Sequence, residues 1–136
     1  MARRLILDTG VLIASERGTA GLAGIVREGD DVVVAAVTVA ELRVGVELAS
    51  QRHRRGREEF LQRALEVLPV EPYDLAAAQA HGRLLAHVHR QGRQRGAHDL
   101  LVAATAVSTG RTLVTTDASA GFGELPGVTC LEISPQ

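Results

Sequence analysis

Residues 97–117, with the sequence AHDLLVAATAVSTGRTLVTTD, contain a helix pattern followed directly by a strand pattern. The first part, 97–109, is a long apolar stretch rich in Ala and Leu, and a single carboxylate, Asp99, stands at its head. The second part, 112–116, is a short apolar run with β-branched residues, and Asp117 follows it. We therefore predict a helix over 97–109 that leads into a buried strand over 112–116.

The rest of the chain repeats this alternation of strand and helix. Further strands are expected at 4–8, 31–36 and 128–133, with a weaker one at 67–71. Further helices are expected at 10–17, 19–28, 38–50, 55–67 and 74–91. The Arg-rich segments 51–57 and 92–96 are predicted as exposed turns or helix ends. The alternation predicts an α/β fold in a single domain over 1–136, with a parallel sheet of four or five strands flanked by helices.

The composition narrows the possible functions. With 136 residues, 46% of them hydrophobic, the chain has the size of one globular domain with one core. Only 2% of the residues are aromatic, so platforms for stacking bases are nearly absent. The single cysteine excludes a disulfide within the chain and a zinc site of several cysteines, which fits a reducing cytoplasm.

All fifteen cationic side chains are arginines, which excludes several nucleotide and phosphate sites. A Walker A loop requires a lysine, and so does the aspartate pocket of a two-component receiver domain. The segment after the first strand, DTGVLI at 8–13, has no GxGxxG pattern. The residues before Asp8 contain too few apolar side chains for a signal peptide or a membrane span, so we expect a cytoplasmic protein with no membrane role.

Four carboxylates are placed at the ends of the predicted elements. Asp8 closes the first strand, Glu41 and Asp99 lie in the first turns of predicted helices, and Asp117 follows the fourth strand. In a parallel α/β sheet the carboxyl ends of strands and the amino ends of the connecting helices share one edge, where ligands bind. All four acids are therefore expected at the same edge.

Each acid also has a local explanation. The segment TVAE at 38–41 fits a capping box, in which Glu41 bonds to the backbone of Thr38. Asp99 fits a position that offsets the helix dipole, and Asp8 and Asp117 fit caps of the turns after their strands. Caps need not converge on one point, however, whereas a divalent cation requires several carboxylates there.

The joint pattern favours a divalent metal site. Carboxylates crowded together repel one another unless a cation neutralises them or their pKa values rise. Mg²⁺ is a hard ion that takes oxygen ligands and keeps several waters, and Mn²⁺ accepts the same ligands. Such a site would attract a phosphodiester and activate water for in-line attack on the phosphorus.

Four short segments occur in a set order along the chain: LDT at 7–9, TVAEL at 38–42, DLLVAATA at 99–106 and VTTD at 114–117. Each is weak alone, but the four together make a specific pattern. The chain resembles the PIN-domain nucleases and, among them, the VapC-type ribonuclease toxins of bacterial toxin–antitoxin modules. The resemblance extends over nearly the whole length and implies a PIN-like three-layer sandwich.

The resemblance implies an endoribonuclease that depends on Mg²⁺ or Mn²⁺ and leaves 5′-phosphate and 3′-hydroxyl ends. Asp8 and Asp99 are expected as direct metal ligands, with Glu41 and Asp117 assisting through water or at a second position. Similarity to the family also implies a homodimer. It further implies a cognate VapB-like antitoxin that lies in a groove of the toxin and obstructs the acidic pocket.

Two threonines resemble the hydroxyl groups that support the acids in this family, namely Thr9 and Thr115. Thr115 also fits an ordinary strand residue whose hydroxyl bonds to backbone. His98 is expected to have a surface or capping role, because neighbouring helical residues point about 100° apart and the proposed chemistry needs no histidine.

The arginines form two clusters. The first is Arg52, Arg54, Arg55 and Arg57 with His53, and we interpret it as a solvated helix end. The second leads directly into Asp99, and its Arg90, Arg93 and Arg95 are the expected contacts to RNA phosphates.

A second hypothesis stays open. The chain is then a catalytically silent binding module on the same fold, in which the acids are caps and the arginines hold RNA or a protein. The complete set of four acids favours the enzyme.

Overall fold

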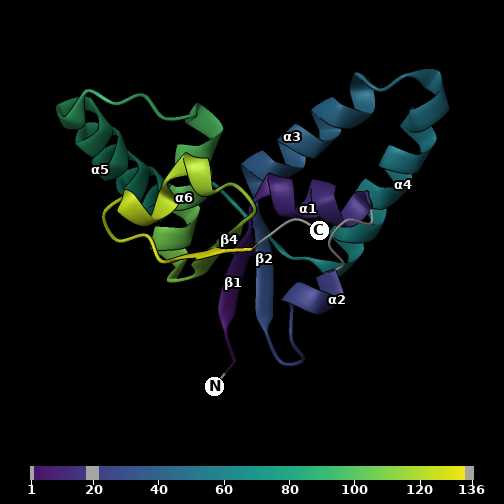
Figure 1. Cartoon of the computed structure of the whole chain (residues 1–136), viewed down its shortest axis with the longest axis horizontal. Coiled ribbons are helices and arrows are strands. Elements are labelled where there is room, and N and C mark those ends of the chain that lie inside the picture. The colour runs from purple at the N-terminus through teal and green to yellow at the C-terminus, as the bar shows by residue number, and fades with distance from the viewer. Residues whose placement is uncertain (1, 18–21, 134–136) are drawn as a thin grey trace.

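The computed structural model describes residues 2–17 and 22–133 (Figure 1). The elements follow in the order β1 (Arg4–Leu7), α1 (Thr9–Glu16), α2 (Leu22–Ile25), β2 (Asp31–Ala35), α3 (Ala36–Glu47), α4 (Gln51–Val67), β3 (Val70–Glu71), α5 (Leu75–Gln91), α6 (Ala97–Thr109), β4 (Thr112–Thr115) and β5 (Cys130–Glu132). Two 3-10 helices, η1 (Ala118–Ala120) and η2 (Phe122–Glu124), lie between β4 and β5.

The strands form one five-stranded sheet with the order β3-β2-β1-β4-β5, and every neighbouring pair is parallel. Helices α5 and α6 lie on one side of the sheet, and α1 and α4 lie on the other (Figure 1). The predicted α/β class, with a parallel sheet flanked by helices, is therefore confirmed. No described helix has both the length and the hydropathy that crossing a membrane requires.

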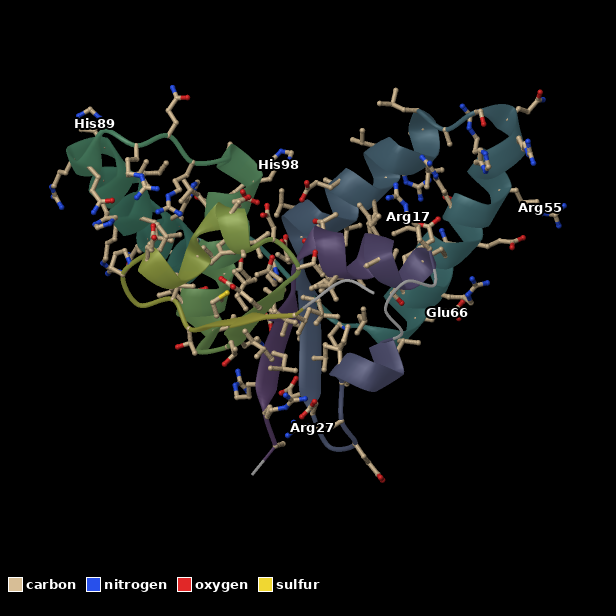
Figure 2. The ribbon with its side chains drawn as sticks, in the orientation of Figure 1. Arg17, Arg27, Arg55, Glu66, His89 and His98 are labelled. Carbon is tan, nitrogen blue, oxygen red and sulfur yellow. The ribbon has the colours of Figure 1, made fainter. Side chains whose placement is uncertain are left out.

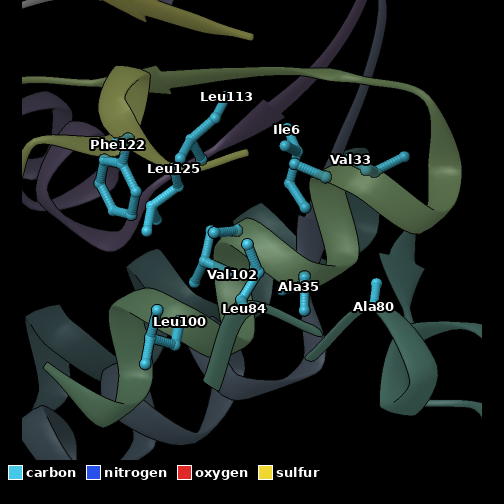
Figure 3. Packing of buried hydrophobic residues seen from close by; sticks show 13 residues of the cluster. Ile6, Val33, Ala35, Ala80, Leu84, Leu100, Val102, Leu113, Phe122 and Leu125 are labelled. Carbon is cyan, nitrogen blue, oxygen red and sulfur yellow. The ribbon is translucent and has the colours of Figure 1, made fainter. Parts of the chain in front are cut away.

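Alternate residues of the central strands build the two halves of the core. In β1, Ile6 packs into the cluster beneath α5 and α6 (Figure 3), whereas Leu5 and Leu7 pack into the cluster beneath α1 and α4. In β4, Leu113 and Val114 divide between the two clusters in the same way. Successive side chains of a strand point to opposite faces, so a continuous apolar run is what a sheet covered on both faces needs.

Several predicted boundaries differ from the structure. Helix α3 begins at Ala36, directly after β2, and ends at Glu47, whereas the prediction was 38–50. The segment 51–57 forms the first two turns of α4, which extends the helix predicted at 55–67. The strand predicted at 67–71 is reduced to Val70–Glu71. The helix predicted at 19–28 appears as Leu22–Ile25, and its residues 19–21 lie outside the described part of the chain.

Arg111 ties together the amino ends of the central strands. Its side chain is 5% exposed, and its Nη1 donates to the backbone oxygen of Asp31 and to Asp31 Oδ1, both at 3.0 Å. The same nitrogen lies 3.4 Å from the backbone oxygen of Leu5, and Nη2 lies 3.7 Å from Glu71 Oε1. One guanidinium therefore joins the amino ends of β1 and β2 and also approaches the side chain of Glu71, the last residue of β3.

Replacing Arg111 by Met is expected to lower the free energy of unfolding by about 2 kcal/mol, because strand carbonyls lose a buried charged donor. Its carboxylate partners remain partly exposed, which keeps the cost below that of a fully buried pair. Urea denaturation measures the change. Arg4→Met is the matched control, since Arg4 binds the same Asp31 from solvent and should cost less than about 1 kcal/mol. Equal losses in the two variants would contradict a special role for Arg111.

Candidate functional site

The four predicted acids lie at the carboxyl edge of the sheet or on the helices that begin there. Asp8 follows β1 and caps α1, accepting a bond of 2.8 Å from the backbone N–H of Thr9. Asp117 follows β4 and caps η1 through the backbone N–H of Ser119 at 3.0 Å. Asp99 lies in the first turn of α6. The expected caps at Asp8 and Asp117 therefore form, and they place both carboxylates beside neighbouring strands.

Thr115 links two of these acids. Its side chain is completely buried, and its Oγ1 donates to Asp8 Oδ2 at 3.0 Å. The same oxygen accepts from the backbone N–H of Asp117, also at 3.0 Å. The hydroxyl group thus orients the Asp8 carboxylate and the turn that carries Asp117, instead of bonding only within its strand.

Glu41 is held by a different threonine. Thr9 Oγ1 donates to Glu41 Oε1 at 2.8 Å and lies 3.4 Å from Thr38 Oγ1. The predicted capping box is therefore wrong: α3 begins at Ala36, so Thr38 and Glu41 both lie inside the helix. The apolar run of β2 passes into α3 without a polar cap, and Glu41, in the second turn, reaches α1 instead of its own backbone.

Burial and mutual repulsion raise the pKa of two of the acids. Burial raises the pKa of Asp8 most, and Glu41 and Asp117 raise it further, while the bonds from Thr115 and Thr9 lower it. Burial also raises the pKa of Asp99, with added repulsion from Asp8, Asp117 and Glu41. Each of the other three acids thus acts electrostatically on Asp99, which is the behaviour expected of carboxylates that share one site.

The donor set fits a hydrated hard cation. Among the described residues, no three Asp, Glu, His or Cys side chains form a ready-made metal cage. Mg²⁺ does not need one, because it is commonly held by one or two carboxylates and keeps several waters. A buried carboxylate, Asp8, and a half-buried one, Asp99, both carry unfavourable charge, and a divalent cation would stabilise them. Asp8 and Asp99 are therefore suited to hold such an ion, with Glu41 and Asp117 close enough to influence it.

The raised pKa values predict a pH dependence of stability. The folded protein binds these protons more tightly than the unfolded chain, so the metal-free protein should become more stable as the pH falls from about 7 to about 4. This gain is complete below the ordinary aspartate pKa of 3.8. Asp30 acts oppositely, because Arg3 lowers its pKa to about 2, and its contribution is lost as the pH falls below 3.8.

Thermal unfolding at several pH values, with and without Mg²⁺, measures this dependence. Since a metal binds the ionised carboxylates, Mg²⁺ should raise the melting temperature more at pH 7 than at about pH 4. A stabilisation by Mg²⁺ that does not change with pH would contradict binding at these two acids.

His98 has a contact that the sequence did not reveal. Its Nδ1 lies 3.3 Å from Glu41 Oε2, so the first turn of α6 meets the second turn of α3 at one of the four acids. The imidazole is 60% exposed and points from α6 toward α3 (Figure 2). The expected surface position is correct, but its contact with a site acid was missed, since these residues are far apart in the sequence.

Arg95 is occupied inside the protein. Its guanidinium is 9% exposed, and Nη1 donates to the backbone oxygens of Ala120 and Gly121 at 2.6 and 2.9 Å. Nη2 donates to Glu124 at 3.1 Å. Gly121 has φ +64°, and a Cβ there would lie 2.7 Å from Arg95 Nη1. Arg95 thus holds the loop after Asp117, and these bonds leave it poorly placed for the predicted RNA contact.

The other two predicted RNA contacts are more exposed. Arg93 Nη1 lies 3.4 Å from Glu124 Oε2 at the surface. Arg90 lies in the last turn of α5, next to His89, which marks the outer end of that helix in Figure 2. The second arginine cluster is therefore divided: Arg95 binds the loop after Asp117, whereas Arg90 lies at the outer end of α5.

Comparison with known proteins agrees with this arrangement. Residues 5–126 match the PIN domain family. Ribonuclease VapC5 of Mycobacterium tuberculosis is 34% identical over 128 residues, which cover 94% of this chain and 92% of that protein. The chain belongs to the PIN-domain family.

Solved structures resemble this PIN domain over nearly its whole length. The crystal structure of VapBC-5 from Mycobacterium tuberculosis, a member of the VapBC toxin–antitoxin systems, matches 96% of this chain and 98% of its own, with a TM-score of 0.79 and 30% identity. VapBC2 from Rickettsia felis, bound to a promoter DNA fragment, matches 96% of this chain and 99% of its own, with a TM-score of 0.87. At 18% identity, the second comparison shows the fold alone. The resemblance to VapC-type PIN domains noted in the sequence is confirmed.

Proposed function

We propose that this PIN domain is the ribonuclease toxin of a toxin–antitoxin module and hydrolyses RNA phosphodiester bonds with Mg²⁺ or Mn²⁺. The observation that carries the proposal is the Thr115 bridge, which joins Asp8 to the turn of Asp117 at the edge where Asp99 and Glu41 also act. The similarity to ribonuclease VapC5 supports the reaction class.

Each side chain of the site has a distinct task in this proposal. Asp8 and Asp99 hold the cation, and Thr115 fixes the orientation of the Asp8 carboxylate. Glu41, oriented by Thr9, faces the same site and can accept a proton from the attacking water. When bound, the cation supplies Lewis acidity, which reduces repulsion of the phosphate and makes water a stronger acid.

Asp117 and its supports act at the border of the site. Its backbone N–H bonds to Thr115 and its carboxylate accepts from Ser119, so the turn is fixed on both sides. Arg95 holds the following backbone through Ala120 and Gly121. We infer that this fixed turn lets Asp117 assist through water or at a second cation position.

The partners of this PIN domain follow from its relatives. Similar solved structures are VapBC toxin–antitoxin complexes, which supports a VapB-like antitoxin that blocks the acidic site. A homodimer and a cytoplasmic location are further parts of the proposal and rest on the family resemblance.

The decisive test is cleavage of total RNA by the purified chain free of antitoxin, with Mg²⁺, with Mn²⁺ and with EDTA. We expect cleavage only with a divalent ion, and 5′-phosphate ends in the products. Asp8→Asn should abolish cleavage, because Asn retains the cap of α1 but removes the charge. Identical RNA patterns for wild type and Asp8→Asn would exclude the catalytic proposal and favour an RNA-binding module.

A further inference from the structure

A cavity of about 460 Å³ lies between α1, α3 and α4, next to the acidic site. Glu41 belongs to both, since it lines the cavity and receives the bond from Thr9 in the site. The volume is within the range of small-ligand sites, about 300 to 1,000 Å³. A polymer bound at the acidic site and extending toward α4 would therefore enter this cavity.

The cavity wall carries three arginines and two carboxylates, Glu16 and Glu41. Arg17 comes from the end of α1, and Arg52 and Arg57 come from the first half of α4. Arg57 Nη1 donates to the backbone oxygen of Gly45 at 3.0 Å, which holds its guanidinium at the wall. Within the described part of the chain, the side chains of Arg17 and Arg52 make no hydrogen bond or ion pair. Their donors are thus available to a ligand.

Neighbouring arginines have different positions and partners. Arg43 pairs with Glu58 at 2.7 Å, and Arg54 bonds to the backbone oxygens of Glu47 and Ala49 at the end of α3. Arg55 pairs with Glu59 on the outer face of α4 and points away from the cavity (Figure 2). The first arginine cluster is therefore not one solvated helix end, because it separates into structural residues and cavity residues.

The start of α4 has an unfavourable charge pattern. Its first turn contains no acid and several cations, and its N-cap Ser50 makes no side-chain bond to the helix. Cations near a helix N-terminus oppose the helix dipole, whereas an anion there is stabilised. An anion bound in the cavity beside Arg52 would offset the unfavourable interaction between this cation and the helix dipole.

Two glycines line the cavity, Gly45 of α3 and Gly56 of α4, and a Cβ at either position would meet no atom within 4 Å. Glycine inside a helix costs roughly 1 kcal/mol relative to alanine, so neither is favoured by helix stability. Ile13, Leu42 and Phe60 supply apolar contacts beside the arginines.

We propose that this cavity binds a phosphate of the RNA, together with its attached nucleoside, next to the bond that is cleaved. Arg17 and Arg52 bind the phosphate, and Arg57, held by the backbone oxygen of Gly45, forms part of the cavity wall. The inference rests on the proposed ribonuclease function and assigns its substrate contacts to α1 and α4 instead of 90–95. RNA is favoured over a peptide because the cavity joins three cations to the site where a phosphodiester must lie, and guanidinium groups bind phosphate through paired donors.

The test compares RNA binding by the full chain, by the double variant Arg17→Gln/Arg52→Gln and by Arg55→Gln. Fluorescence anisotropy with a labelled single-stranded RNA of about 12 nucleotides, in EDTA, measures binding without cleavage. The salt series runs from about 50 to about 200 mM NaCl. Cleavage of the same RNA in Mg²⁺ is measured separately, and thermal unfolding confirms that each variant folds.

The double variant is expected to bind RNA at least about tenfold more weakly than wild type, as loss of charge-assisted bonds implies. The slope of log affinity against log salt should fall in magnitude by about 1.4, or roughly 0.7 for each lost phosphate contact to a single strand. Arg55→Gln removes one positive charge from the outer face of α4, half the charge change of the double variant, and should leave both quantities near wild type.

Unchanged RNA affinity and salt slope in the double variant would overturn the inference and leave the cavity to a peptide partner, even if wild type cleaves RNA. Equal weakening by Arg55→Gln would also overturn it, since general charge would then explain the effect. If wild type binds but does not cleave, and the double variant alone loses affinity, the cavity assignment holds and the ribonuclease proposal fails. If wild type does not bind RNA in EDTA, the cavity assignment fails, and cleavage in Mg²⁺ decides the ribonuclease proposal separately.

Discussion

Asp99→Asn is expected to reduce RNA cleavage more than about 100-fold while raising the melting temperature of the metal-free protein. Substitution of a residue that hydrogen-bonds to a metal ligand commonly lowers metal affinity or activity about 10- to 100-fold. Loss of a proposed ligand itself should therefore lower activity further. The stabilisation follows from the raised pKa of Asp99, because burial and three acids disfavour its charged form. The gain should stay below about 1 kcal/mol, because Asp99 is half-buried and solvent screens part of the repulsion.

Initial cleavage rates and thermal unfolding in EDTA measure the two effects. Asp74→Asn is the matched control: Asp74 caps α5 through the N–H of Ala77, and Asn caps a helix about equally well. It should change neither activity nor stability appreciably. Normal cleavage by Asp99→Asn would remove Asp99 from the proposed cation site, and a lower melting temperature would show that its helix-dipole role outweighs the repulsion.

Thr115→Val is expected to lower cleavage about 10- to 100-fold and the free energy of unfolding by about 2 kcal/mol. Valine has nearly the same shape but leaves the Asp8 carboxylate and the N–H of Asp117 without the buried hydroxyl that now bonds to both. The orientation of Asp8 should loosen, so the Mg²⁺ concentration needed for half-maximal cleavage should rise.

Two other variants distinguish orientation from packing. Thr115→Ser retains the hydroxyl and should recover most of the activity and metal affinity. Thr105→Val removes another buried hydroxyl, which bonds only within α6 to Leu101, and should leave cleavage near wild type. If Thr115→Ser is as impaired as Thr115→Val, the methyl packing of the threonine matters more than its hydrogen bonds.

The predictions that succeeded rest on local patterns and on one topological rule. The sequence predicts strands β1, β2 and β4 and helix α6 from their apolar runs. A sheet covered on both faces requires nearly continuous apolar sequence in its strands. Asp8 and Asp117 could then be placed together, since neighbouring parallel strands end at one edge. The TVAE segment fits a capping box in its local pattern, but the partner of Glu41, Thr9, comes from another helix.

The sequence by itself therefore determined the α/β class, the PIN-domain family and the order in which four acids reach one edge, because periodicity and strand ends are properties of short segments. Only the tertiary structure decided which arginines are free. Arg95 donates its hydrogen bonds to backbone oxygens 25 and 26 residues away. Arg17 and Arg52, by contrast, come from different helices and line the same cavity. Side-chain partners separated by this much chain are selected by packing, and no local pattern encodes that choice.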